Sequence, residues 1–150
     1  MPFLDTPDSI IAVLTEGGRH ALARVLLGEL SFIYDSFAVG RGGYDMLNPV
    51  KITTIDPALT ELEDHIFPVG ATKSLESPIF NPNPQATSCI CRLTTAEALA
   101  GLGEAGLWCR IDKSNIPAEV GTLFMFAVAH FPIQVKTDRH VYVMRFVTQF

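Results

Sequence analysis

Apolar residues in the first part of the chain recur at helical spacing, with charged residues between them. This stripe predicts an amphipathic helix that begins near Thr15, because Thr is a favoured N-cap residue and Glu16 suits the first turn. Gly28 is a typical stop signal for such a helix. Residues 9–14, which precede it, fit either a short strand or an approach to the helix. The stripe consists of Ala21, Leu22, Val25 and Leu26.

A second helix start is predicted at Asp56-Pro57. Asp is a good N-cap residue, and proline is well tolerated at the first helical position. The pattern that follows is short, so we expect this helix to end near Glu63.

Most of the remaining apolar residues follow the patterns typical of strands. Cys89, Cys91 and Leu93 alternate with polar or half-polar neighbours, which predicts one buried face. Residues 123–131 are nearly all apolar, as in a strand buried on both faces. In chain order, strands are predicted over residues 32–39, 87–94, 107–111, 123–131 and 140–150.

Together these elements predict an α+β fold. An N-terminal helix and a short helix would pack on a mostly antiparallel β-sheet that is formed largely by the second half of the chain. A length of 150 residues suits one domain with a substantial core. The sequence therefore predicts a single domain over residues 1–150.

A proline-rich segment at about residues 74–86 interrupts these patterns. Pro78, Pro82 and Pro84 fall within seven residues, which excludes a regular helix or a central strand. We expect an exposed connection here. Its prolines and Phe80 are candidates for an arm that contacts a neighbouring subunit.

The composition narrows the functional classes. Apolar residues make up 48% of the chain and charged residues 18%, whereas soluble domains usually carry about 25% charged residues. This excludes an intrinsically disordered chain and indicates that some apolar surface serves a partner subunit. A net charge of −5 without a basic cluster argues against nucleic-acid binding. No apolar run is long enough for a membrane span, and the first residues lack the basic region of a secretory signal.

The three cysteines leave two interpretations open. A zinc site needs four ligands, and the Cys-x-Cys spacing of Cys89 and Cys91 does not supply the usual pairs. These two thiols would point the same way from a strand, which is poor geometry for pairing with each other. One interpretation is that all three cysteines are buried apolar residues. The other is that Cys109 forms a disulfide, either with one of the other two cysteines or with a neighbouring subunit.

A glycine-rich loop follows the first predicted strand and contains Gly40, Gly42 and Gly43. No Lys-Ser/Thr pair and no helix follow it directly, so the phosphate-binding and dinucleotide-binding fingerprints fail. We expect a tight turn that needs positive φ values.

Acidic residues and a histidine gather at the predicted end of the second helix. Glu61, Glu63, Asp64 and His65 could serve acid–base or metal chemistry, but a charge run in this position is usually a solvated face. We therefore expect no site there.

Two other histidines and one glutamate are the remaining candidates for chemistry. His130 and His140 could share a metal across paired strands, yet neither has an Asp, Glu or Cys at ligand spacing, which favours core or edge histidines. Glu104 is either an uncharged buried acid or, more commonly, a carboxylate that accepts backbone amides. From the residues alone we expect no catalytic residue, no cofactor and no metal, and hence no enzyme.

Four stretches in order nevertheless resemble a known family. They are residues 15–23, 37–44 and 102–108, then 123–132 followed by Lys136-Thr137. Their order is similar to the N-terminal attachment domain of phage tail-collar and tail-fibre proteins. In that family an Ala-rich helix precedes an Ala-Val-Gly-x-Gly-Gly turn, and a Glu-x-Gly-Leu strand, an apolar strand and a Lys turn lead into a final strand. The resemblance covers about residues 15–150.

The resemblance implies a structural, non-catalytic role in a virion that is assembled in the host cytoplasm. The chain would dock a fibre or spike onto the tail, baseplate or neck. Its partners would be copies of itself, in a trimer or ring, and other tail, baseplate or fibre proteins. Glu104 would anchor backbone amides beside Trp108, and Gly106 would be a structural glycine. Trp108 would be a core or interface anchor, and Tyr44 would be an interface candidate.

Fibres of this family continue into a long shaft and tip, whereas this sequence ends at Phe150 after its last predicted strand. We therefore expect a free-standing collar, baseplate or tail-fibre adaptor, with a neck or tail-completion protein as the alternative within the virion. The alternative outside it is a small ligand- or carbohydrate-binding module that uses Tyr34, Tyr44 and Tyr142, although Tyr142 belongs to a predicted core face.

Overall fold

The computed structural model describes residues 8–45, 47–82 and 85–149, and most of this part of the chain is β-strand. In chain order its elements are β1 (Asp8–Leu14), α1 (Glu16–Leu26), β2 (Leu30–Gly40), β3 (Tyr44–Asp45), β4 (Asn48–Ile52), β5 (His65–Phe67), β6 (Lys73–Ser74), β7 (Glu76–Pro82), β8 (Gln85–Leu93), β9 (Gly101–Ser114), the 3-10 helix η1 (Pro117–Glu119), β10 (Leu123–Val135) and β11 (Tyr142–Gln149).

The strands form one large sheet in the order β5-β2-β9-β10-β1-β11-β8-β7, and β6 also pairs with β2. Neighbouring strands are antiparallel except for β1 and β11, which run parallel. The residues before α1 are therefore a strand, and it lies in the centre of the sheet. β3 and β4 form a separate two-stranded hairpin.

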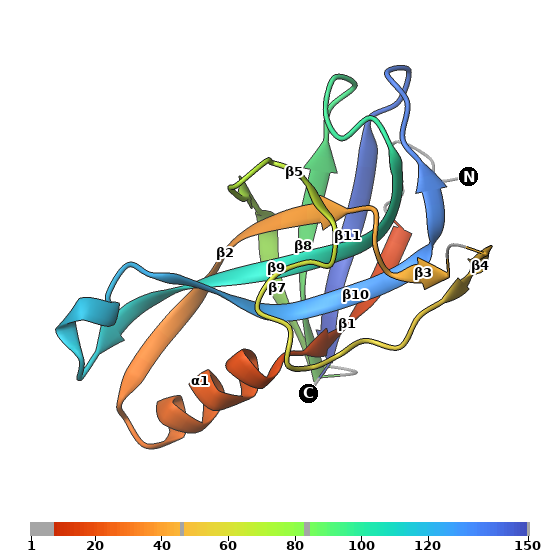
Figure 1. The fold of residues 1–150 in the computed structure, drawn as a ribbon. Coiled ribbons are helices and arrows are strands. Elements are labelled where there is room, and N and C mark those ends of the chain that lie inside the picture. The colour runs from red at the N-terminus through yellow and green to blue at the C-terminus, as the bar shows by residue number, and fades with distance from the viewer. Residues whose placement is uncertain (1–7, 46, 83–84, 150) are drawn as a thin grey trace.

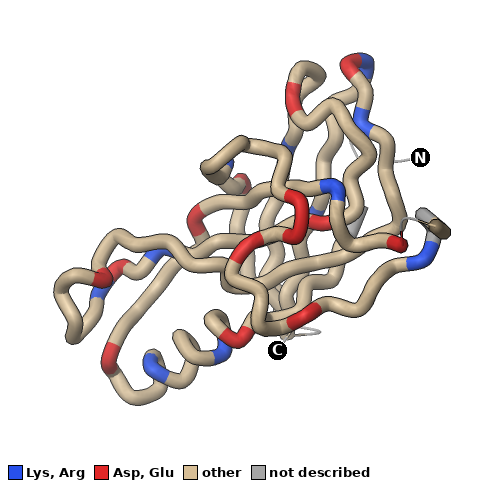
Figure 2. Tube along the Cα trace, in the orientation of Figure 1, with Lys and Arg blue, Asp and Glu red and all other residues tan. Residues whose placement is uncertain are grey.

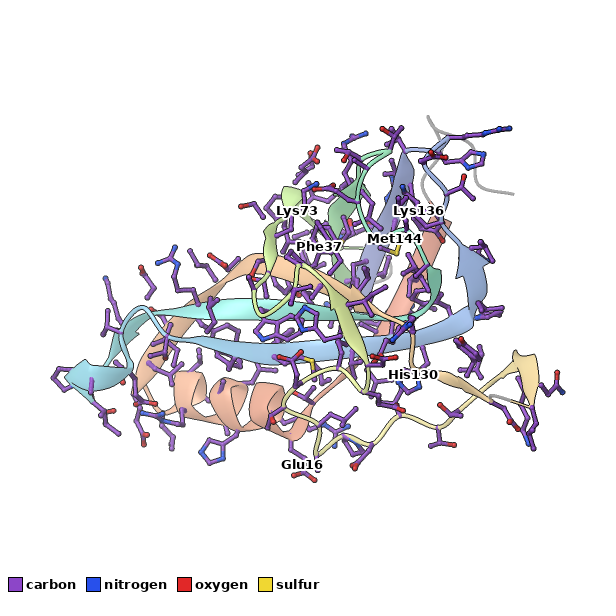
Figure 3. The ribbon with its side chains drawn as sticks, turned by 45° about the horizontal axis from the view of Figure 1, so that its top comes forward. Glu16, Phe37, Lys73, His130, Lys136 and Met144 are labelled. Carbon is purple, nitrogen blue, oxygen red and sulfur yellow. The ribbon has the colours of Figure 1, made fainter. Side chains whose placement is uncertain are left out.

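The large sheet curls so that its two halves face each other (Figure 1). Strands β2, β9 and β10 cross over the strands β1, β11, β8 and β7 in this view. The main core fills the space between the halves: Phe37, Leu107 and Phe126 come from one side, and Cys91 and Met144 from the other. Phe37 and Met144 are fully buried (Figure 3).

A second, smaller core lies on the outer face of β2, β9 and β10. Ala38, Gly106 and Val128 are directly opposite one another in the register, so they share this face. The Trp108 ring lies across Gly106, where a Cβ would stand 2.6 Å from the indole. Residues 53–64, here called the covering segment, cross this face between β4 and β5 (Figure 1). The covering segment packs on it through Ile55, Leu59 and Leu62.

Helix α1 begins as predicted. Thr15 Oγ1 accepts the backbone N–H of Gly18 at 2.9 Å, which is the expected N-cap bond, and it also donates to the carbonyl of Met125 at 2.6 Å. The helix lies so close to β10 that a Cβ on Gly18 would stand 2.4 Å from the carbonyl oxygen of Phe126. Gly28 follows the helix with a φ of 73°, as expected of a stop signal.

The predicted apolar stripe of α1 is only partly buried against the sheet. Gly18 and Ala21 are buried, whereas Val25 and Leu26 are exposed. The helix therefore meets the sheet through its first turns, and its last turn presents apolar side chains to solvent.

The predicted helix at Asp56 is wrong. Residues 56–64 contain turns, and a side-chain oxygen of Asp56 accepts the N–H of Ala58 at 2.9 Å. Asp closes such local turns by the same hydrogen bonding that lets it cap helices. Leu59 and Leu62 both pack on the outer face of the sheet.

The proline-rich segment is not an irregular connection, which corrects the prediction for residues 74–86. It contains β7, which pairs with β8 at one end of the sheet order. Prolines are tolerated on such an edge strand because one side of it does not donate to the ladder. Its exposure is as expected, since every residue of β7 is exposed. Pro84, in the turn that follows, lies outside the described residues.

The remaining strand predictions are confirmed as β2, β8, β9, β10 and β11. Cys89, Cys91 and Leu93 share one buried face of β8, and residues 125–131 are buried on both faces of β10. The fold is thus α+β or mostly β, with a curled sheet that takes strands from both halves of the chain. Among the described residues, no helix has the length and apolar character that a membrane crossing requires.

Positions of charged residues of both signs are distributed along the described chain (Figure 2). The end of the covering segment carries Glu61, Glu63 and Asp64. This acidic end lies over the part of the sheet where the candidate site is found.

Candidate functional site

Glu104 occupies the middle of a polar row on the outer face of the sheet. Gly40 on β2, Glu104 on β9 and His130 on β10 are directly opposite one another. Opposite residues of an antiparallel sheet project from the same face. Both Glu104 and His130 are buried. Buried polar groups of this kind need partners, and the loops above the sheet supply them.

Three backbone amides surround the Glu104 carboxylate. The N–H groups of Gly42 and Asp64 donate to Oε2 at 2.7 and 2.8 Å, and the N–H of Glu63 donates to Oε1 at 2.8 Å. One amide belongs to the glycine loop, residues 40–45, and two belong to the end of the covering segment. Glu104 is therefore a carboxylate that accepts amides, and it fastens both segments to β9.

The glycines of the loop serve two different needs. A Cβ on Gly40 would stand 2.7 Å from Glu104 Oε2, and a Cβ on Gly42 would stand 2.3 Å from the same atom. These two glycines therefore allow the carboxylate to approach the backbone. Gly43 alone of the three has a positive φ, at 88°. The expected positive-φ turn is thus confined to Gly43, and the close approach explains the other two.

His130 is held in one orientation by the start of the covering segment. Its Nδ1 lies 2.9 Å from the carbonyl oxygen of Thr53, and since a carbonyl can only accept, Nδ1 carries the hydrogen. Nε2 is buried and makes no hydrogen bond within the part of the chain that the structure describes. Glu63 Oε2 is nevertheless 3.1 Å from this nitrogen. The carboxylate therefore lies beside the direction in which Nε2 points and not along it.

Glu63, Glu104 and His130 together form what we call the polar cluster. One ligand atom from each, either a carboxylate oxygen or a ring nitrogen, lies within 4.8 Å of the other two. His130 is drawn between β10 and the covering segment in Figure 3. The side chain of His130 is 0% exposed and that of Glu63 is 44% exposed, so the cluster is reached from solvent along Glu63.

The structure separates the charged residues that the sequence grouped together. Glu61 pairs with His65 at 2.9 Å, and Asp64 pairs with Arg41 at 3.0 Å. Only Glu63 of this run joins the polar cluster. His140 contacts Thr137 in its own turn at 2.8 Å, and β1 lies between β10 and β11 in the sheet, so His130 and His140 do not face each other across paired strands. His130 is buried, in line with the favoured interpretation. Sequence reasoning missed the polar cluster, because only the register of β9 with β10 brings its members together.

The cysteines are free and buried, so of the two interpretations that the sequence left open, buried apolar residues are found and a disulfide within the chain is not. Cys89, Cys91 and Cys109 are at most 1% exposed, which also keeps them from a neighbouring subunit. Burial raises the pKa of the Cys91 and Cys109 thiols. They serve as small apolar residues of the core.

Two of the predicted interface residues lie away from the open surface. Trp108 is buried in the outer-face core, so of its two predicted roles it has the core role. Tyr44 is half-buried. Its ring packs so closely on Gly103 that a Cβ on this glycine would stand 2.3 Å from the ring. Tyr142, a candidate surface aromatic, is buried as well.

The other interface candidates that lie among the described residues share one exposed surface. We call it the β7 surface and define it by Glu76–Pro82; it includes Pro78, Phe80 and Pro82. Ile79 is 58% exposed and Phe80 is 64% exposed. Because successive side chains of a strand project from opposite faces, each face of this edge strand carries one large exposed apolar side chain.

An apolar hollow of about 510 Å³ lies between β7 and the first half of β2. Phe32, Tyr34, Pro78 and Phe126 line it. The Tyr34 hydroxyl is already hydrogen-bonded to Thr87 on β8. The hollow thus offers mainly apolar contacts beside the β7 surface.

Comparisons with protein-family models, with curated proteins and with solved structures find no match for this chain.

Proposed function

We propose that this chain is a structural subunit of a bacteriophage particle, an adaptor of the collar, baseplate or tail fibre that docks a fibre or spike onto the tail or neck. The observation that carries the proposal is the β7 surface, where Ile79 and Phe80 are both exposed, on opposite faces of an edge strand. Edge strands with exposed apolar side chains favour association, and solitary proteins usually protect them. The four motifs shared with phage attachment domains supply the virion setting.

The β7 surface associates through its side chains more than through its backbone. Pro78 and Pro82 have no N–H, so β7 cannot offer a complete ladder to an added strand. Phe80 instead acts as an anchor that enters a pocket on the partner, as large apolar residues do at the centre of interfaces, and Ile79 offers an apolar contact on the other face of the strand. The apolar hollow next to Pro78 extends this surface.

A second exposed apolar set lies at the far end of α1. Arg24 of α1 contacts Glu119 of η1 at 2.8 Å, so these two short elements are neighbours. An adaptor needs contacts on two sides, one for each piece that it joins. The exposed apolar residues near this contact are Leu26, Leu27, Ile116 and Val120.

The apolar hollow favours one other candidate, a small ligand-binding module. Its volume of about 510 Å³ suits a small molecule. A carbohydrate is less suitable, because Tyr34 is engaged with Thr87 and Tyr142 is buried, which leaves few rings for stacking. Binding of an apolar ligand by a chain that stays monomeric would favour this candidate over the adaptor.

Location in the particle tests the proposed function. Purified particles from the phage that encodes this chain would be labelled with a gold-conjugated antibody against it and imaged. Label at the neck, baseplate or fibre base supports the proposal. Particles that carry no label and contain none of the chain by mass spectrometry would overturn it.

A further inference from the structure

We infer that the polar cluster of Glu63, Glu104 and His130 binds a divalent transition-metal ion, with Zn²⁺ as the best fit. The inference rests on the contacts of these three side chains and is independent of the proposed function. It concerns what holds the covering segment on the outer face of the sheet.

The donor set suits this class of ion. A ring nitrogen and two carboxylate oxygens are ordinary ligands of Zn²⁺, and all three lie within 4.8 Å of one another. Zn–N and Zn–O bonds of about 2.0–2.2 Å in a tetrahedron place two ligand atoms roughly 3.4 Å apart. His130 Nε2 and Glu63 Oε2 are 3.1 Å apart, close to that separation.

The orientation of His130 favours an ion over a simple ion pair. Its Nδ1–H donates to the carbonyl of Thr53, which fixes the tautomer and leaves Nε2 free to coordinate. In an ion pair Nε2–H would point at Glu63, yet this nitrogen is buried without a hydrogen bond. A metal ion placed along the free direction of Nε2 would instead have the carboxylate beside it, which is the observed arrangement.

Glu104 meets the second requirement of a metal site, which is a ligand held in place by outer contacts. Its Oε2 accepts the amides of Gly42 and Asp64, while Oε1 accepts only that of Glu63. A carboxylate oxygen has two lone pairs, so Oε1 keeps one for an ion. The amides orient this ligand as outer-shell partners do in metal proteins.

The charges of the surrounding side chains also favour a bound cation. Two carboxylates lie beside the histidine ring. The covering segment carries two further acidic residues next to Glu63, which are Glu61 and Asp64. Arg41 is already engaged with Asp64. A divalent cation would balance the two carboxylates, and the half-exposed Glu63 gives it a path from solvent. Three protein ligands leave the fourth position for a water molecule.

The bound ion would tie two parts of the chain together. Glu63 belongs to the covering segment, whereas Glu104 and His130 belong to β9 and β10. Coordination would therefore clamp the covering segment on the sheet and raise the melting temperature by mass action.

The test is a Zn²⁺ titration of the full chain after treatment with a chelator, by calorimetry and by thermal melting. Two matched variants separate the polar cluster from its neighbour. Glu63→Gln removes a ligand from a half-exposed position, so it should fold normally. Glu61→Gln changes the adjacent exposed carboxylate, which contacts His65 instead.

We expect one Zn²⁺ per chain and a higher melting temperature with the ion. Glu63→Gln should weaken binding by at least about tenfold, and Glu61→Gln should change it by less than about twofold. Absence of saturable binding to the parent chain would overturn the inference. Equal loss in the two variants, or loss in Glu61→Gln alone, would place the ion elsewhere and overturn it as well.

Discussion

Glu104 Oε2 accepts the backbone N–H of Gly42 at 2.7 Å, across a position where any side chain on residue 42 would collide with the carboxylate. This contact, with the amides of Glu63 and Asp64, joins β9 to the glycine loop and to the covering segment. A single buried side chain thus organises the outer face of the sheet.

Replacement of Glu104 by Gln should therefore destabilise the fold. The amide group of Gln would face backbone N–H groups that need acceptors, and a buried unsatisfied donor costs about 1–3 kcal/mol. We expect the free energy of unfolding to fall by about 2–4 kcal/mol in urea denaturation. Glu61→Gln is the control, because the Glu61 side chain is 55% exposed and the substitution should change the value by less than about 0.5 kcal/mol. Equal stability of the two variants would show that the amides do not depend on Glu104.

Two adjacent glycines in the first turn of α1 should respond in opposite directions to Ala. A Cβ on Gly18 would stand 2.4 Å from the Phe126 carbonyl oxygen, whereas the nearest atoms to a Cβ on Gly17 are 3.7 Å away. Gly18→Ala should cost about 1–3 kcal/mol, since helix and strand must move apart. Gly17→Ala should be neutral or stabilise by up to about 1 kcal/mol through helix propensity. Thermal or urea melts of both variants give the comparison, and similar losses at the two positions would contradict the close packing of α1 on β10.

The cysteines should be protected from modification in the folded chain. Burial raises the pKa of Cys91 and Cys109, so the reactive thiolate is disfavoured as well as covered. We expect no reaction with a thiol reagent at mildly alkaline pH until denaturant is added, after which all three thiols should react. Rapid labelling of the native chain, or a dimer on non-reducing electrophoresis, would contradict their burial.

Acid should weaken the contact between α1 and η1. Hydrogen bonds from Arg24, then from Ser114, lower the pKa of Glu119 below its ordinary value of 4.5. The folded chain therefore holds this proton less tightly than the unfolded chain does. The stabilisation is complete above about pH 4.5 and disappears as the pH falls through the lowered value.

The variant Glu119→Gln lacks this contribution at every pH. The difference in stability between the parent chain and Glu119→Gln should be largest near neutral pH and should shrink as the solution becomes acidic. Urea melts over a pH series measure it. A difference that stays constant down to strongly acidic pH would show that Arg24 and Glu119 do not interact through charge.

The local signals in the sequence predicted single elements well. Thr15 and Gly28 marked the ends of α1, and the alternation around Cys89 and Cys91 marked the buried face of β8. These features depend on neighbours within a few residues, so they can be read from the chain itself. Asp56 shows the limit of such signals, because the same type of side chain can close a turn or cap a helix, and here it closes a turn.

The polar cluster could not be predicted in the same way. Glu63, Glu104 and His130 are far apart in sequence, and only the pairing of β9 with β10 and the path of the covering segment bring them together. The exposed edge at β7 depends likewise on the order of strands in the sheet. The prolines indicated exposure there, while the strand itself follows from pairing with β8.

The central claim, that the β7 surface joins this chain to another, is tested most directly by sedimentation of the parent chain and of Phe80→Lys over a range of concentrations. Val69→Lys is the matched control, because Val69 is 86% exposed outside β7. The account predicts that the parent chain and Val69→Lys form a trimer or ring as the concentration rises, and that Phe80→Lys weakens this association by at least about tenfold. A parent chain that stays monomeric at every concentration, or a Phe80→Lys variant that associates as the parent does, would contradict it.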